Sequence, residues 1–470
     1  MSREKELAKN TAILTIGKIC TQFVSFLLLP LYTSILNPDD YGIHDLLTSY
    51  IFLLVPLFSL MLDQGLFRFV LDCRDDNNKI KNLVSTMTCI NVVGIAFYVA
   101  LYICIQGFVI SKYKIYLLVG VILHIVMNAL LQFARGIGKT QLYAISSFIS
   151  ATSQVLLNIV LLVFLRMGAW GLFISSMIGS AVTDFVLALG LQIWKYIDIK
   201  ACSKETARVL LKYSLPFIPN QLSWWAIGVS DKTIISWFIN VTANGVYSVA
   251  NKFSTIYITF YNVFNLSWTE SVSLHISDDD TEDYLKNMIN SLFSLFFSVC
   301  FGIIAFMPYI FTLMINEKYA SAYPQVPILM VAVLFQTIVG SYSVVYVALK
   351  KSNEIAKTSF FAAIINIVVN VALIRWIGLY AASISTLVAY VVMTIYRYID
   401  IKKYMNIPLQ KKPLYLIIGM FICVSYYINN RYLNAFTAIV TIAFAIVSNI
   451  EIIKMVFEIV KIKIDLIIKH

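Results

Sequence analysis

Charged residues are scarce in this sequence. Asp, Glu, Lys and Arg make up 13% of the 470 residues, whereas 60% are hydrophobic. A water-soluble chain carries roughly 25% charged residues, so the class of soluble globular proteins is excluded. The apolar residues come in runs of about 20, the length of an α-helix that crosses a hydrocarbon core. The sequence therefore predicts an all-α polytopic membrane protein of about fourteen transmembrane helices.

The sequence also lacks the spacings of common catalytic and metal sites. Its seven cysteines and four histidines are scattered, so no metal or redox site is expected. Gly138-Lys139-Thr140 resembles the end of a phosphate-binding loop, but Phe133 stands where the first glycine belongs. The loops expected outside the cell are too short to form a catalytic domain. We expect no cofactor and no enzymatic activity.

The apolar runs predict the helices and the lobes. They are expected at 11–35, 42–64, 83–106, 115–134, 144–165, 169–193, 213–238, 244–268, 287–314, 325–348, 358–375, 378–397, 413–430 and 433–453. Two six-helix lobes, 1–203 and 204–405, are expected to precede a helix pair and basic tail at 406–470. An even number of helices places both termini on one side of the membrane.

The distribution of basic residues predicts which side that is. With the termini inside, 27 of the 36 lysines and arginines fall in cytoplasmic segments and six in outer segments. Such an excess marks the cytoplasmic side, so both termini are expected in the cytoplasm. The net charge of +11 is spread over these short loops rather than gathered on one domain. A nucleic-acid partner is therefore not expected.

Two short patterns recur in the same order in both halves. The segment Ile35–Gly42 is similar to Phe238–Gly245, and Gln154–Asn158 is similar to Asn366–Asn370. The offsets are similar, and each of the later two segments is followed by Arg and then Gly. The order indicates two six-helix halves of the same orientation, an arrangement in which transporters bind substrate between the halves near the membrane midplane.

Polar residues follow single faces of several predicted helices. The first helix carries Thr11, Thr15, Lys18, Gln22 and Ser25 at spacings of three and four, and the eighth carries Tyr247, Asn251, Ser254, Tyr261, Asn265 and Trp268. The second helix adds Asp45 and Ser49. Such stripes suit a water-filled cleft, although Ser, Thr and Asn also serve as hydrogen-bond partners between membrane helices.

Charges inside the predicted helices point more directly to function. A Lys or Asp at a helix centre costs about 2.5–3.5 kcal/mol on insertion scales, so Lys18 and Lys252 are candidate ligand-binding residues. Asp231 and Lys232 lie nearer the outer end of their predicted helix, so they could have a functional role or could simply lie at the membrane interface. Asp63 and Glu270 lie near cytoplasmic ends, where a solvated helix end is the simpler reading. Lysines in a cleft favour an anionic ligand.

Three segments carry a resemblance to a known family. The segments Leu28–Gly42, Ser230–Lys252 and Arg135–Tyr143 are similar to parts of polysaccharide flippases of the O-antigen (Wzx) type. These flippases belong to the multidrug/oligosaccharidyl-lipid/polysaccharide (MOP) exporter superfamily. The length, helix count and plan of six, six and two helices fit that family over the whole chain.

The resemblance implies a substrate, a location and partners. The substrate would be an oligosaccharide repeat unit on an undecaprenyl pyrophosphate carrier, and the location the bacterial cytoplasmic (inner) membrane. Polysaccharide polymerase and chain-length proteins would be the partners. The substrate-binding residues are expected to be Lys18, Lys252, Lys232, Gln22, Asn251 and Tyr261, with Asp63, Asp231 and Glu270 as candidates for proton or sodium coupling.

Two other functions stay open at this point. A drug or cation antiporter of the same superfamily would need a cleft dominated by acids, whereas lysines lie deep here. A membrane polysaccharide polymerase typically carries a large outer loop, which this sequence lacks.

Overall fold

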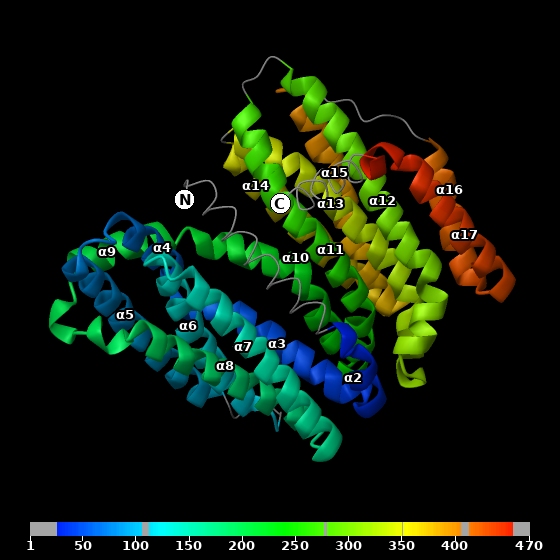
Figure 1. Cartoon of the computed structure of the whole chain (residues 1–470). Coiled ribbons are helices and arrows are strands. Elements are labelled where there is room, and N and C mark those ends of the chain that lie inside the picture. Colours follow the sequence, from blue (N-terminus) through cyan, green and yellow to red (C-terminus); the bar gives the residue numbers. More distant parts are fainter. Residues whose placement is uncertain (1–25, 106–111, 277–279, 350, 406–412, 455–470) are drawn as a thin grey trace, which may run out of the picture. The chain divides into compact units, whose positions relative to one another are not determined.

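The computed structural model describes residues 26–105, 112–276, 280–349, 351–405 and 413–454, and within these ranges it is helical with no strand. The chain divides into two compact units, Met1–Gly245 and Val246–His470. Figure 1 shows the helices of both units in sequence colours. The predicted all-α class is confirmed for the described residues.

The first unit is built around α6. Its elements are α2 (Leu29–Ile35), α3 (Pro38–Ser59), α4 (Leu62–Asp72), α5 (Asn77–Ile105), α6 (Lys114–Gly136), α7 (Thr140–Ile159), the π-helical turn η1 (Val160–Phe164), α8 (Ala169–Leu191), the 3₁₀ turns η2 (Ile193–Lys195) and η3 (Ile199–Ala201), α9 (Lys204–Ser214), α10 (Phe217–Phe238) and the start of α11 (Val241–His275). Helix α6 packs on α3, α4 and α8, and α7 packs on α8.

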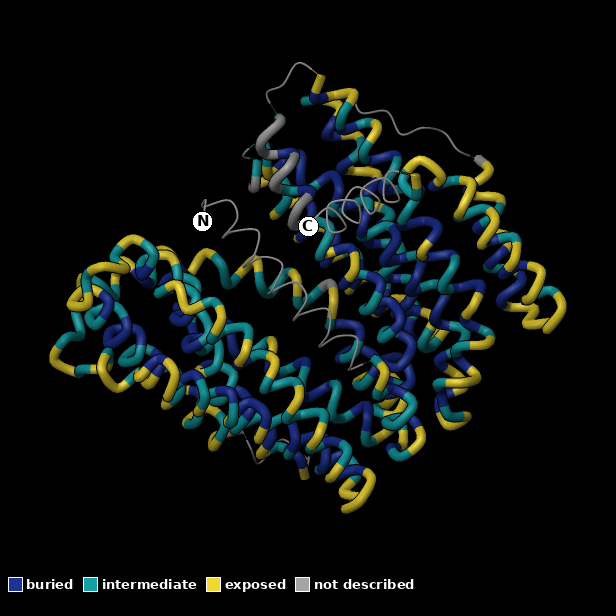
Figure 2. The backbone as a smooth tube through the Cα atoms, in the orientation of Figure 1, coloured by how far each residue is buried: buried dark blue, intermediate teal, exposed yellow. Residues whose placement is uncertain are grey.

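The second unit is built around α12, α13 and α15. After α11 it contains α12 (Thr281–Met314), η4 (Glu317–Gln325), α13 (Val326–Ala348), α14 (Ser352–Ile377), α15 (Leu379–Ile401), α16 (Pro413–Ile428) and α17 (Arg431–Ser448). Helix α15 packs on α13 and α14, while α16 and α17 pack on α12. Figure 2 shows buried residues interspersed with less buried ones along α12, where 61% of the most apolar window is buried.

Ten helices of the described residues are long and apolar enough to cross a membrane. They begin at Pro38, Asn77, Lys114, Thr140, Ala169, Thr281, Glu317, Asn353, Leu379 and Arg431. The chain is therefore a multi-pass membrane protein. The expected count of fourteen stays a prediction, as does the expected lobe boundary at 203.

The predicted helix 42–64 is wrong in one respect, because the chain breaks at its end. Leu60 and Met61 both have left-handed backbone angles, with φ of 51° and 54°. Two such residues end the i→i−4 hydrogen-bond ladder of α3. The new helix α4 then buries Leu62, Leu66 and Val70, spaced four residues apart, in one core cluster. The apolar run conceals this break because it continues through Leu62.

The structure repeats one loop conformation in both units. Gly168, before α8, has φ 58° and ψ −138°, and Gly378, before α15, has φ 56° and ψ −132°. Only glycine adopts such angles readily. Asn158 on α7 accepts a hydrogen bond from Ser175 on α8. In the second unit, Asn366 on α14, which corresponds to Gln154 in the sequence repeat, donates to Thr386 on α15 over 3.2 Å, so an amide joins the two helices in each unit from different repeat positions. The pattern agrees with the internal repeat predicted from the sequence.

Candidate functional site

The start of α3 is fixed by local sequence. Asn37 is extended, Pro38 occupies the first turn, and Asp39 and Asp40 follow in the same turn. Proline suits the first helical turn because its missing N–H is not needed there, and acids complement the positive end of the helix dipole. These residues therefore place Gly42 in the second turn of α3.

Gly42 lies in backbone contact with the start of α11. A Cβ atom at Gly42 would lie 2.1 Å from the Val241 oxygen, and one at Gly245 would lie 1.9 Å from the Pro38 oxygen. Neither position has room for a side chain. Asn244 adds a hydrogen bond, donating its amide nitrogen to the Gly42 oxygen over 2.9 Å. The two copies of the first repeated pattern thus pack directly against each other within Met1–Gly245.

An ion pair joins α3 to α10 beside this contact. The Lys232 ammonium lies 2.8 Å from one carboxylate oxygen of Asp45 and 3.0 Å from the other. The side chains are 15% and 16% exposed. One turn further along α3, the Ser49 carbonyl oxygen accepts a hydrogen bond of 2.9 Å from the Trp225 ring nitrogen. We call these three contacts between α3, α10 and the start of α11, namely Gly42–Gly245, Asp45–Lys232 and Ser49–Trp225, the helix-end clamp.

The predicted lysines differ in their surroundings. Lys18 and Gln22 lie outside the described residues. Lys232 is paired with Asp45. Lys252 is half-buried on α11 and forms no ion pair or hydrogen bond with any described residue. It lies eleven residues after Val241, roughly 16 Å along the helix, which is about half the thickness of a hydrocarbon core. Lys252 thus lies well inside α11 and has no partner among the described residues.

Two other predicted substrate-binding residues, Asn251 and Tyr261, lie on the same helix as Lys252. Asn251 is half-buried, whereas Tyr261 is 3% exposed. The Tyr261 hydroxyl donates to the Asn265 side-chain oxygen over 3.0 Å. Its ring also lies against Gly340 of α13, where a Cβ would be 2.2 Å from the hydroxyl oxygen. In this structure Tyr261 therefore serves helix packing, while Asn251 is the more accessible of the two.

The predicted coupling acids do not form one cluster. Asp63 is buried at the start of α4 and accepts a hydrogen bond of 2.7 Å from the Gln64 amide. Asp231 is buried on α10, and the side chain of Glu270 lies outside those described. Among the described residues, no three His, Cys, Asp or Glu side chains gather as metal ligands would.

The sequence analysis missed two charges inside helices. Asp184 lies on α8 in a cavity wall, and Arg397 lies on α15, fully buried. The Arg397 guanidinium donates to Thr358 over 2.8 Å and to the Val339 oxygen over 3.1 Å, and so ties together α13, α14 and α15. Both are lone ionisable residues in apolar runs, and Arg397 is one of the 27 basic residues that the predicted topology assigns to cytoplasmic segments.

Comparison with protein families identifies the chain. Residues 7–269, more than half of the sequence, match the family described as polysaccharide biosynthesis protein. The chain belongs to this family. No curated protein matches the sequence of this family member.

Solved structures identify the fold of this polysaccharide biosynthesis family member. An inward-facing multidrug resistance MATE family transporter of the MOP superfamily has a TM-score of 0.67 and 13% identity, covering 81% of this chain and 95% of its own. A MOP superfamily transporter from Pyrococcus furiosus has a TM-score of 0.55 and 15% identity, covering 84% and 96%. A mutant form of a Vibrio cholerae MATE transporter has a TM-score of 0.57 and 13% identity, covering 88% and 100%. The family model confirms the resemblance to polysaccharide biosynthesis proteins, and the solved structures show that the chain shares the fold of these transporters.

Proposed function

We propose that this protein is a flippase for lipid-linked oligosaccharides. It would move repeat units on undecaprenyl pyrophosphate from the cytoplasmic to the outer leaflet of the bacterial inner membrane, for O-antigen or capsule synthesis. The observation that carries the proposal is the match to a polysaccharide biosynthesis family in a chain with a transporter fold. Both termini would lie in the cytoplasm, as the basic residues predict.

The substrate chemistry explains why a protein is needed. Each sugar hydroxyl that enters hydrocarbon without a partner costs several kcal/mol, about 4–8 for transfer to an alkane. A hydrated cleft removes that cost while the lipid tail stays in the bilayer. A negative cell interior also favours outward movement of an anion by about 2.3 kcal/mol per charge per 100 mV.

The described lysines support a division of roles. Lys252 has no partner among the described residues, so its ammonium is available to attract the pyrophosphate together with Lys18. Lys232 is already held by Asp45 and would act mainly through the helix-end clamp. Gln22 and Asn251 would form hydrogen bonds with the sugar hydroxyls, and Tyr261 would support the wall of the substrate cleft. Asp63, Asp231 and Glu270 are the candidates for ion coupling.

The helix-end clamp supports alternating access. Its glycine contact and ion pair lie toward the end where α3 and α11 begin and α10 ends, which the basic residues predict to be outside. Its Trp225–Ser49 hydrogen bond lies nearer the middle of α3 and α10. A flippase must open this end to release its product and close it again. We propose that the Asp45–Lys232 ion pair and the Trp225 hydrogen bond separate during that opening, because side-chain contacts reform more readily than backbone packing at Gly42.

The test of the function is a gene deletion in the producing bacterium. Single repeat units are expected to accumulate on the cytoplasmic leaflet, with loss of surface polymer. Normal polymer together with heightened sensitivity to cationic drugs would instead identify an antiporter. Accumulation of single units on the outer leaflet would identify a polymerase.

The lysine assignment has its own prediction. Lys252→Ala combined with Lys18→Ala is expected to lower flipping at least about tenfold, because an ion pair with a buried phosphate contributes about 2 kcal/mol or more. The measurement is the rate of surface polymer formation in the deletion strain that carries each variant.

The matched control for the lysine assignment is Lys357→Ala. Lys357 is 61% exposed and pairs with Glu354 on its own helix, so its loss should leave flipping unchanged. Wild-type flipping by the double variant, at equal protein level in the membrane, would refute the assignment of these lysines and leave the flippase function standing.

A further inference from the structure

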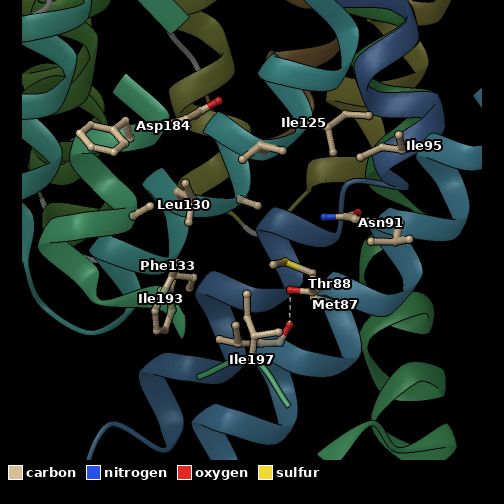
Figure 3. Close-up of a pocket in the computed structure, with 16 residues that line it drawn as sticks. Met87, Thr88, Asn91, Ile95, Ile125, Leu130, Phe133, Asp184, Ile193 and Ile197 are labelled. Carbon is tan, nitrogen blue, oxygen red and sulfur yellow. Dashed lines mark hydrogen bonds between the residues drawn. The ribbon is translucent and has the colours of Figure 1, made fainter. Parts of the chain in front are cut away.

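A second candidate site lies inside the first unit. A cavity of about 460 Å³ is lined by α5, α6 and α8 and by residues just after α8. Figure 3 shows its lining, which is almost entirely apolar and includes Ile125, Leu130 and Phe133. Small-molecule sites typically have volumes of about 300–1,000 Å³ and apolar walls with a few polar groups. This cavity has the size and lining of such a site.

Two of the three polar residues in the lining carry side-chain oxygens without a donor among the described residues, and the third, Thr88, donates its hydroxyl to the Val84 oxygen. Both carboxylate oxygens of Asp184 and the side-chain oxygen of Asn91 are buried with no hydrogen-bond partner in the described part of the chain. Figure 3 shows the two residues on different walls, Asp184 on α8 and Asn91 on α5. Buried acceptors are normally satisfied, and each exception requires an explanation. A ligand whose donor reaches these oxygens would satisfy them.

The cavity opens toward an apolar surface. Val92 and Phe185 line it and are 59% and 65% exposed, and Val126 at the same rim is also exposed. These residues belong to helices that are apolar enough to span a membrane. A ligand would therefore enter from the hydrocarbon and must itself be mostly apolar.

The depth of Asp184 selects among lipophilic ligands. It lies seven residues before Leu191, the end of α8, or roughly 10 Å inside that helix end. The headgroup of a phospholipid lies at the membrane interface, so its amine would not reach this depth without drawing the headgroup into hydrocarbon. A smaller amine dissolved in the bilayer has no such constraint.

We propose that this cavity binds a lipophilic amine from the bilayer. The apolar body of the ligand fills the space between α5, α6 and α8, and its ammonium group donates to the Asp184 carboxylate. No hydrogen bond holds this carboxyl within the described residues, so none has to break when it turns toward the cavity. The lining includes neither Lys252 nor any residue of the helix-end clamp, and the proposal does not depend on the flippase function.

The test uses the purified full chain in phosphatidylcholine nanodiscs, whose headgroups carry no N–H donor. The probe is radiolabelled desipramine, a tricyclic secondary amine, and its saturable binding is measured against empty discs. Asp184→Asn keeps the shape and removes the charge, and it is expected to weaken binding at least about tenfold. Val126→Trp, which fills the rim and keeps the carboxylate, is expected to abolish binding. Iminodibenzyl, which has the rings but no amine chain, should not compete.

The matched control is Asp72→Asn. Asp72 lies on α4, pairs with Arg68 and is 57% exposed, so its loss should not alter binding. Equal binding to Asp184→Asn and to the wild type would overturn the proposal, and so would equal competition by iminodibenzyl. Phosphatidylethanolamine retained by the wild type but not by Asp184→Asn in native mass spectrometry, without desipramine binding, would overturn it in favour of a lipid headgroup.

Discussion

Gly245→Ala is expected to destabilise the protein by about 3 kcal/mol or more, the upper range for overpacking in a fixed environment. The added Cβ would lie 1.9 Å from the Pro38 carbonyl oxygen and 2.8 Å from its carbonyl carbon. These are backbone atoms at the start of a helix, and they cannot rotate away as a side chain would. The measurement is the apparent melting temperature of detergent-purified protein, with the yield of monodisperse material as a second readout.

Gly302→Ala is the matched control for this prediction. Gly302 lies within α12, and a Cβ there would meet no atom within 4 Å. Alanine is favoured over glycine inside a helix by about 1 kcal/mol, so this variant should be as stable as the wild type or slightly more stable. Equal melting temperatures of Gly245→Ala and Gly302→Ala would show that α3 and α11 do not approach as closely as the structure indicates.

Breaking the Asp45–Lys232 pair from one side is expected to cost about 3 kcal/mol. Both side chains are mostly buried, so Asp45→Asn would leave the ammonium without its carboxylate and Lys232→Met would leave a buried carboxylate without this cation. The double variant should regain most of the lost stability, because neither charge remains. Thermal unfolding of the two single variants and the double variant forms a double-mutant cycle that isolates the pair.

The exposed pair Lys79–Asp76 provides the comparison. Its side chains are 73% and 42% exposed, and such pairs contribute about 0–1 kcal/mol. If the stability losses of Asp45→Asn and Lys232→Met simply added in the double variant, as is expected for substitutions at Lys79 and Asp76, the Asp45–Lys232 pair would not be energetically coupled. The flipping rate of the double variant separates a structural role of the pair from a role in transport. If the pair only stabilises the fold, the double variant should flip substrate at the wild-type rate.

Several features of the fold could be predicted from composition and periodicity alone. Runs of about 20 apolar residues determine helices, because lipid offers backbone groups no other partner. Their sequence positions agree with the observed elements within a few residues over most of the chain, for example 169–193 for α8. The break at Leu60 and Met61 was not predictable, because both residues are apolar and neither is a type that favours left-handed angles.

The candidate site shows the same division. The sequence singled out Lys232 and placed Asp45 on a polar face, because ionisable residues in apolar runs are costly and therefore conspicuous. It did not pair the two, since they are 187 residues apart and only packing brings their helices together. It likewise could not distinguish Lys232, which has a partner, from Lys252, which has none among the described residues.

The repeated glycines show most clearly which features the sequence determines and which depend on the tertiary structure. The sequence by itself determined a multi-pass helical protein with an internal repeat, because apolar length and local pattern depend only on residues close in the chain. Only the tertiary structure decided that Gly42 and Gly245 touch, that Asp45 holds Lys232, and that Asp184 lies in a cavity without a donor among the described residues. These are distances between segments far apart in sequence, and they follow from how the helix surfaces fit together.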